Sequence, residues 1–125
     1  MKHLALIAAL SGVIATAATA QSLTRPQQNA VRSAENYLGF APFSRRGLIA
    51  QLSSPYGDGY AVADATAAVN SLTVDWHAQA AKAARNYLEM MGFSCNGLID
   101  QLSSDAGDQY TPSEAAYGAQ QAGAC

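Results

Sequence analysis

The chain has 125 residues, of which 50% are hydrophobic and 13% are charged, and its formal charge is −2 with a pI near 5.5. A chain this rich in apolar residues is expected to fold rather than to stay disordered. The acidic balance argues against nucleic acid as a partner, because proteins that grip phosphate backbones usually display a basic face.

The first twenty residues have the pattern of a signal peptide. A lysine precedes an apolar stretch from Leu4 to about Ala17, and the small residues at positions 18–20 are typical of a cleavage site. The alternative is an uncleaved anchor, although the run is shorter than the roughly 20 apolar residues that span a bilayer. We expect cleavage near Ala20, which leaves a periplasmic or secreted protein, and no lipid at the cleavage site, because no cysteine follows it.

The segment from residue 27 to residue 73 is predicted to form three short helices. Apolar residues recur three or four positions apart before Pro42, which indicates a first helix that ends there. Ser44 is a good N-cap for a second helix, in which Gly47 is expected to let another helix approach closely. The Gly57–Tyr60 turn then leads to a third helix from about Val62, whose start carries no capping side chain.

The same phrase begins again after an offset of 50 residues. Among the positions that recur unchanged are Tyr37, Leu38, Phe43, Ser44, Gly47, Leu48, Ile49, Gln51, Leu52, Ser53, Ser54, Gly57, Asp58, Tyr60 and Ala65. A duplicated unit of this length predicts an all-α fold of two tandem three-helix repeats packed together, at residues 21–73 and 74–125. We expect each repeat to need the other to bury its apolar face.

The second copy has its own start and stop signals. Asp75 is the expected N-cap of the helix that opens at Trp76, and Gly92 is expected to end that helix in the manner of a C-terminal glycine. Thr111-Pro112-Ser113-Glu114 offers an N-cap, a proline in the first turn and a capping-box glutamate. The third helix should therefore start more sharply here than in the first copy.

Both cysteines fall in the second copy. In an oxidising compartment Cys95 and Cys125 are expected to form a disulfide that ties down the C-terminal tail. The alternatives are two free thiols or an intermolecular bridge. Catalysis by Cys95 is disfavoured, because Arg45 holds the equivalent position and His77, eighteen residues away, shows no pairing pattern.

No pattern indicates a catalytic, cofactor-binding or metal site. Asp58 and Asp108 each follow glycine in a turn, where aspartate commonly bonds its own backbone, so we favour a structural role over an acid–base pair. His77 alone cannot make a metal site, and the acidic residues lack calcium-loop spacing. Trp76 and the repeated first-helix tyrosines are interpreted as core residues rather than a ligand platform.

Residues that differ between the copies are free to serve recognition. Arg45 and Arg46 stand at the start of a predicted helix, an unfavourable end for positive charge. We therefore take these two residues, together with Tyr56, as candidates for contacting an acidic protein partner. The alternative is a solvated pair of charges.

The order of these motifs resembles a known family. Tyr-Leu, Phe-Ser, Gly-Leu-Ile, Gln-Leu and a Gly-Asp-x-Tyr turn occur in each copy, with Asp75-Trp76 between them, as in the Ltp family of host cell surface-exposed lipoproteins. The likeness covers about residues 27 to 120. It implies tandem helix-turn-helix-like units in an exported, non-enzymatic protein. It also implies a role in superinfection exclusion, in which entry of another phage's DNA is blocked at the cell surface.

Three hypotheses about function follow. The first is a protein-binding repeat at the cell envelope that interferes with phage DNA entry, with a phage component as the partner. The second is an envelope-binding or structural surface module unrelated to phage. The third, a secreted enzyme or inhibitor, would require a cleft that gathers several polar residues. None of them calls for a cofactor, and neither nucleic acid nor a small-molecule substrate is expected.

Overall fold

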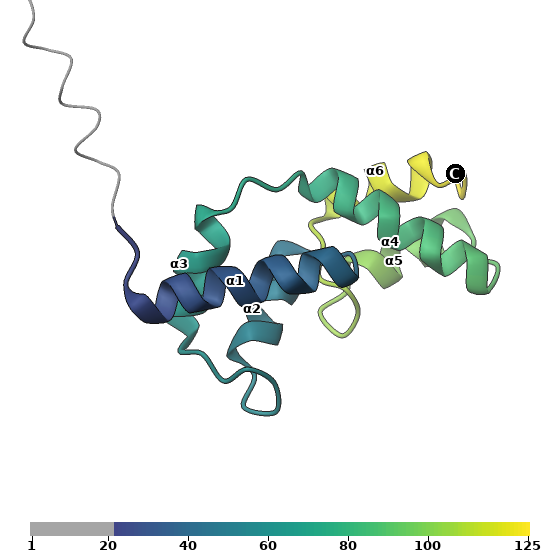
Figure 1. Cartoon of the computed structure of the whole chain (residues 1–125). Coiled ribbons are helices and arrows are strands. Elements are labelled where there is room, and N and C mark those ends of the chain that lie inside the picture. The colour runs from purple at the N-terminus through teal and green to yellow at the C-terminus, as the bar shows by residue number, and fades with distance from the viewer. Residues whose placement is uncertain (1–21) are drawn as a thin grey trace, which may run out of the picture.

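The computed structural model describes residues 22–125, so the predicted signal peptide lies outside the described residues. These residues form helices joined by turns and extended links, which confirms the all-α prediction. The helices are α1 (Arg25–Phe40), α2 (Arg45–Ser53), α3 (Val62–Ser71), α4 (Trp76–Met90), α5 (Cys95–Ser103) and α6 (Pro112–Gln121). The first repeat, α1–α3, and the second repeat, α4–α6, lie next to each other along the molecule (Figure 1).

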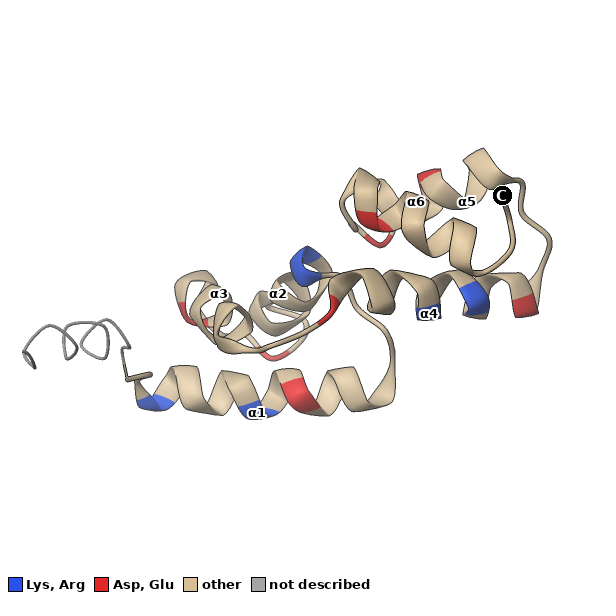
Figure 2. Cartoon of the chain, turned by 90° about the horizontal axis from the view of Figure 1, so that it is seen from above, with Lys and Arg blue, Asp and Glu red and all other residues tan. Residues whose placement is uncertain are grey.

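Each repeat is a small bundle in which the third helix is central. In the first repeat α3 packs against both α1 and α2, and in the second repeat α6 packs against both α4 and α5. Seen from above, the basic segments lie on α1 and α4 and at the start of α2 (Figure 2). Cations and carboxylates are thus interspersed along residues 22–125.

Each repeat has a hydrophobic core of its own. The first core contains the buried residues Ala34, Leu48, Leu52, Ala65 and Val69. The second core contains the buried residues Ala80, Ala83, Ala84, Leu98, Leu102, Tyr110, Ala115 and Ala119. The second repeat therefore closes its core without the first, contrary to the prediction, whereas the first core also uses one side chain from the second repeat. Small alanines let three short helices pack closely enough to close a core within one repeat.

The predicted helix starts are confirmed. The hydroxyls of Ser44 and Ser94 accept hydrogen bonds from the third residue of their helices, and the Asp75 side chain does the same for α4. Thr111 makes a full capping box at α6, whereas Ala61 gives α3 no side-chain cap. The third helix does start more sharply in the second repeat.

The ends of α1 and α4 correct one prediction. Gly92 does not adopt the left-handed conformation of a C-terminal glycine, since the glycines with positive φ among the described residues are Gly59 and Gly123. Instead, Ala41 and Met91 are both extended, and each donates its backbone N–H to a tyrosine carbonyl four residues earlier. Pro42 and Gly92 follow these caps in the same way, so both helices end alike.

One side chain crosses the boundary between the repeats. Trp76 is the first residue of α4, yet it packs, half-buried, against the core of the first repeat. Its interpretation as a core residue is confirmed, but the core is not that of its own repeat. The start of α4 therefore contributes to the stability of α1–α3.

Candidate functional site: the groove between the repeats

The repeats touch through a small polar interface. The backbone N–H of Phe43 donates to the side-chain oxygen of Gln79 at 3.1 Å. The Ser44 hydroxyl donates to the backbone carbonyl of Asp108. Arg46 makes an ion pair of 3.1 Å with Asp105. The start of α2 is thus held against α4 and against the turn that follows α5.

Gly47 is required at this interface for a reason that differs from the predicted one. A Cβ atom at Gly47 would lie 2.9 Å from the Ser44 hydroxyl and 3.4 Å from the Asp108 carbonyl. The glycine therefore makes room for the capping hydroxyl and for the turn of the second repeat. It does not serve the approach of another helix.

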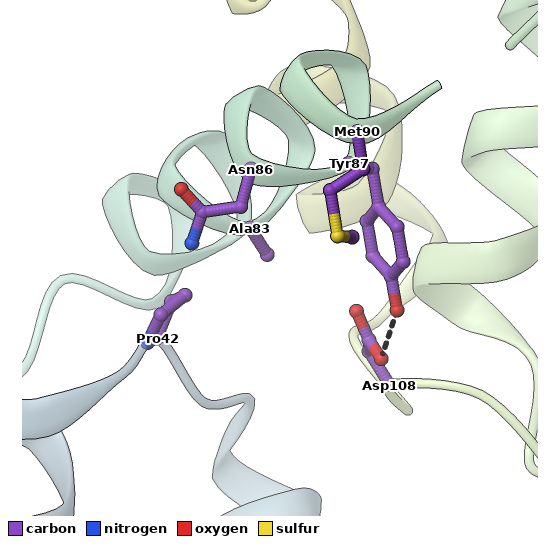
Figure 3. A pocket seen from close by; sticks show the side chains of 6 residues that line it. All are labelled: Pro42, Ala83, Asn86, Tyr87, Met90 and Asp108. Carbon is purple, nitrogen blue, oxygen red and sulfur yellow. Dashed lines mark hydrogen bonds between the residues drawn. The ribbon is translucent and has the colours of Figure 1, made fainter. Parts of the chain in front are cut away.

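A groove of about 240 Å³ opens beside this interface. Figure 3 shows Pro42, from the first repeat, on one side of the groove and the side chains of Asn86, Tyr87 and Met90, from α4, on the other. Ala83 and Asp108 complete the lining. The groove thus combines an apolar wall with an amide and a carboxylate, and both repeats are needed to form it.

A second hollow of about 200 Å³ shares Pro42 and Asp108 with the first. Ser44, Gly47 and Tyr110 are among the residues that line it. The two hollows are therefore neighbours at the boundary between the repeats.

The carboxylate in the groove is held by a network that is repeated in both halves. The Tyr87 hydroxyl donates to Asp108 at 2.9 Å and accepts from the Gln101 amide at 3.1 Å. In the first repeat, Tyr37 makes the equivalent bond to Asp58 at 3.0 Å. The prediction that these aspartates bond their own backbone is wrong in this detail, since each bonds the tyrosine of the preceding long helix. Their structural role is what keeps them in both copies.

Burial shifts the titration of this network. Burial raises the pKa of Asp108, an effect that the hydrogen bond from Tyr87 partly offsets. Burial also raises the pKa of Tyr87, and the hydrogen bond to Asp108 and its negative charge act in the same direction. The tyrosine is therefore held in its neutral, donating form.

One buried polar atom in the second repeat has no partner. The hydroxyl of Tyr110, a residue only 2% exposed, makes no hydrogen bond with any described residue. The equivalent Tyr60 hydroxyl lies 3.0 Å from the Ser33 hydroxyl. Position 83 carries alanine where the first repeat has Ser33. The second repeat has thus kept the tyrosine and lost its partner.

Comparison with known proteins identifies the family. The family model described as host cell surface-exposed lipoprotein (Lipoprotein_Ltp) matches residues 26–72 and again residues 75–121. The chain belongs to this family. The two matches correspond closely to the two structural repeats, and they confirm the resemblance seen in the motifs.

A solved structure agrees with this assignment. The chain is similar to Ltp, a superinfection exclusion protein from the Streptococcus thermophilus temperate phage TP-J34, with 28% sequence identity and a TM-score of 0.70. The match covers 79% of this chain and 97% of that one. A search of curated proteins finds no match.

The structure gives the two candidate arginines intramolecular partners. Arg45 donates from Nε to the Asn70 side chain at 2.9 Å, which ties the start of α2 to the end of α3. Arg46 contacts Asp105 across the boundary, as described above. Tyr56, in the turn after α2, is 99% exposed. A partner contact by these three residues stays a prediction, and only Tyr56 is left without an intramolecular explanation.

In the second repeat a disulfide takes the place of the Arg45–Asn70 contact. Cys95 stands at the position equivalent to Arg45, and the structure joins it to Cys125 in the tail after α6. Both devices connect the start of the second helix to the end of the third. The difference between the copies at this position is explained by two ways of making the same connection.

Gln79 and Asp105, which bind Phe43 and Arg46 of the first repeat, were not found from the sequence. Gln79 is a buried polar residue, and its equivalent in the first repeat is the exposed Asn29. Asp105 is replaced there by Pro55. Both positions differ between the copies, and this divergence was the signal that could have found them as residues of the contact between the repeats.

Between residues 22 and 125 no cluster of three or more His, Cys, Asp or Glu residues is placed to hold a metal ion. Within the same range no helix combines the length and the apolar character needed to cross a membrane.

Proposed function

We propose that this protein acts at the cell envelope as a non-enzymatic binding protein that excludes superinfecting phage by blocking entry of their DNA. The observation that carries the proposal is the similarity to a phage superinfection exclusion protein over 97% of that chain. The family's description as host cell surface-exposed supports the location. Export by the predicted signal peptide would bring the protein there.

The groove between the repeats is the surface that we assign to the protein partner. Met90 lines the groove and is 71% exposed, so its apolar side chain is accessible to a partner there. Asn86 and Asp108 add polar groups that could orient a partner chain. Ser44 and Tyr87 are already engaged with Asp108, which supports a binding role rather than a catalytic one.

The proposal is tested by expressing the full chain in a phage-sensitive bacterium. We expect plating of a susceptible phage to fall while adsorption is unchanged and DNA entry, followed by quantitative PCR of intracellular phage DNA, is lost. A variant that lacks residues 1–20 should restore infection, because it stays inside the cell. Reduced adsorption would contradict the proposed step and indicate a block at the receptor.

The assignment of the groove has a matched control within the chain. Met90→Arg places a large charged side chain at the groove and is expected to abolish exclusion. Phe40→Arg changes the equivalent, 87% exposed position in the first repeat and should leave exclusion intact. Circular dichroism would show that both variants keep their helices. Equal activity of the two variants would remove the groove from the proposal.

The alternative is an envelope-binding or structural module unrelated to phage, which the family's surface location also favours. This function predicts that the purified protein sediments with isolated cell-wall or membrane material. Sedimentation with no effect on any phage in a broad panel would favour the alternative over exclusion.

A further inference from the structure

The interface between the repeats joins two different surfaces. The first repeat contributes the start of its second helix, which we call the cap face and define as Phe43–Gly47. The second repeat contributes what we call the turn face, defined as Gln79 together with Asp105–Asp108. An interface between unlike surfaces is heterologous, so it can be repeated indefinitely unless the geometry closes a ring.

Each repeat carries both faces but uses only one of them. The cap face of the second repeat is Phe93–Gly97, and the turn face of the first repeat is Asn29 together with Pro55–Asp58. Ser44 is 2% exposed where it meets the other repeat, whereas its equivalent Ser94 is exposed. Asp58 and Asn29 are exposed as well. The molecule therefore ends in two exposed surfaces at the positions equivalent to the two halves of its internal interface.

The free cap face offers the donors that are used inside the chain. The Ser94 hydroxyl accepts from Gly97 at 3.0 Å, as Ser44 does from its own helix, but no described residue accepts its proton. The backbone N–H of Phe93 likewise donates to no described residue, whereas that of Phe43 bonds Gln79. The internal interface shows that these donors fit a turn carbonyl and a side-chain amide.

The free turn face carries the aromatic residue that the fold leaves unexplained. Tyr56 is 99% exposed, and its equivalent in the internal interface is Ala106, next to the Asp105 that pairs with Arg46. The free cap face has Asn96 in place of Arg46, and the free turn face has Pro55, followed by Tyr56, in place of Asp105. Tyrosine is enriched at protein interfaces because it combines a large apolar ring with a hydrogen-bonding group.

We propose that the protein associates head to tail with a second copy of itself, the turn face of one copy docking on the free cap face of the other. In this contact the Ser94 hydroxyl donates to the Asp58 carbonyl of the neighbour. The Phe93 N–H donates to Oδ1 of its Asn29, an atom that also accepts from Arg32 within its own chain. The ring of Tyr56 packs beside Asn96. Because the contact uses unlike faces, it adds copies in a line and does not stop at a dimer.

We expect the association to be weak in dilute solution, because the internal interface that it repeats consists of a few polar contacts. Confinement at an envelope would strengthen it by raising the local concentration. The proposal is independent of any phage, so an inactive protein that still associates would leave this inference intact.

The test follows the exported, purified protein by sedimentation velocity and amide NMR spectra from about 10 μM to about 1 mM, the range in which small interfaces associate. We expect the sedimentation coefficient to rise with concentration. Amide shifts on dilution should be confined to residues 93–97, residue 29 and residues 55–58. A constant sedimentation coefficient up to the highest concentration, or shifts located elsewhere, would overturn the proposal.

Two variants and a control sharpen the result. Tyr56→Ala should weaken association about tenfold, the loss expected on removing an aromatic anchor. Ser94→Asp keeps a good N-cap but replaces the donor with a negative charge, and it should abolish association in a folded protein. Tyr117→Ala changes a tyrosine on α6 outside both faces and should have no effect. Association that withstands the first two changes would refute the proposed contact.

Discussion

Removing the repeated tyrosine hydroxyl should change stability in opposite directions in the two repeats, because the Tyr110 hydroxyl has no hydrogen-bond partner among the described residues and the Tyr60 hydroxyl has one. Leaving a buried hydroxyl without a hydrogen bond costs about 1–3 kcal/mol. Tyr110 is 2% exposed, so bulk water does not reach it, and burial raises its pKa far above the usual value, which keeps the group protonated. Tyr110→Phe removes the unpaired atom and keeps the ring in the core. We expect the free energy of unfolding to rise by about 1 kcal/mol.

The matched change in the first repeat should have the opposite effect. Tyr60→Phe removes a hydroxyl that lies 3.0 Å from the Ser33 hydroxyl, so it should lower stability by about 0.5–1 kcal/mol. Ala83→Ser supplies the missing partner to Tyr110 instead. It should raise stability by less than Tyr110→Phe does, because serine in a helix costs about 0.5 kcal/mol relative to alanine.

The assay is urea and thermal unfolding followed by circular dichroism at 222 nm. For a domain of this size, 1 kcal/mol corresponds to a change in Tm of about 4 °C or more. A loss of stability in Tyr110→Phe equal to that in Tyr60→Phe would refute the reasoning. The Tyr110 hydroxyl would then have a hydrogen-bond partner, such as a buried water molecule.

Three further predictions concern the second repeat. A Cβ at Gly118 would lie 2.7 Å from the Ala80 carbonyl, so Gly118→Ala should lower the urea midpoint by an amount equivalent to about 1–3 kcal/mol, and a midpoint at or above that of the wild type would contradict this close approach. Because burial raises the pKa of Asp108, the free energy of unfolding should fall as the pH rises from about 4 through that pKa. Asp108→Asn should reduce this dependence on pH when unfolding is measured over the same range. Cys125→Ser should lower the free energy of unfolding by about 3–4 kcal/mol, since the disulfide closes a loop with a sequence separation of 30. Two free thiols in the wild-type protein, seen by intact mass after alkylation without reductant, would contradict this prediction.

The local signals in the sequence predicted the helices because each acts within one turn of chain. Ser44 and Ser94 cap helices through bonds to residues three positions later, and Thr111 with Glu114 does the same. These interactions depend on spacing alone, so they can be read without knowing the fold. The failure at Gly92 has the same origin, since glycine permits a left-handed cap but does not require one.

The groove could not be predicted, because its contacts join residues far apart in the chain. Ser44 and Asp108 are separated by 64 positions, and Arg46 and Asp105 by 59. No periodicity links such pairs, and alanine-rich helices give little information about which faces meet. Arg46 was singled out because it differs between the copies, but only the structure could show that it pairs with a carboxylate of the same chain, and its contact with a partner protein stays a prediction.

Because Trp76 of the second repeat packs on the core of the first, the two repeats cannot be separated equally well. A fragment that stops at residue 73 would leave the first core uncovered at the point where the indole now lies, although it keeps every helix of that repeat. A fragment that starts at residue 74 would keep its own core complete but would expose the Trp76 ring to solvent. A fragment of the first repeat should therefore extend past Trp76, and a fragment of the second repeat is expected to fold with an exposed apolar residue at its N-terminus.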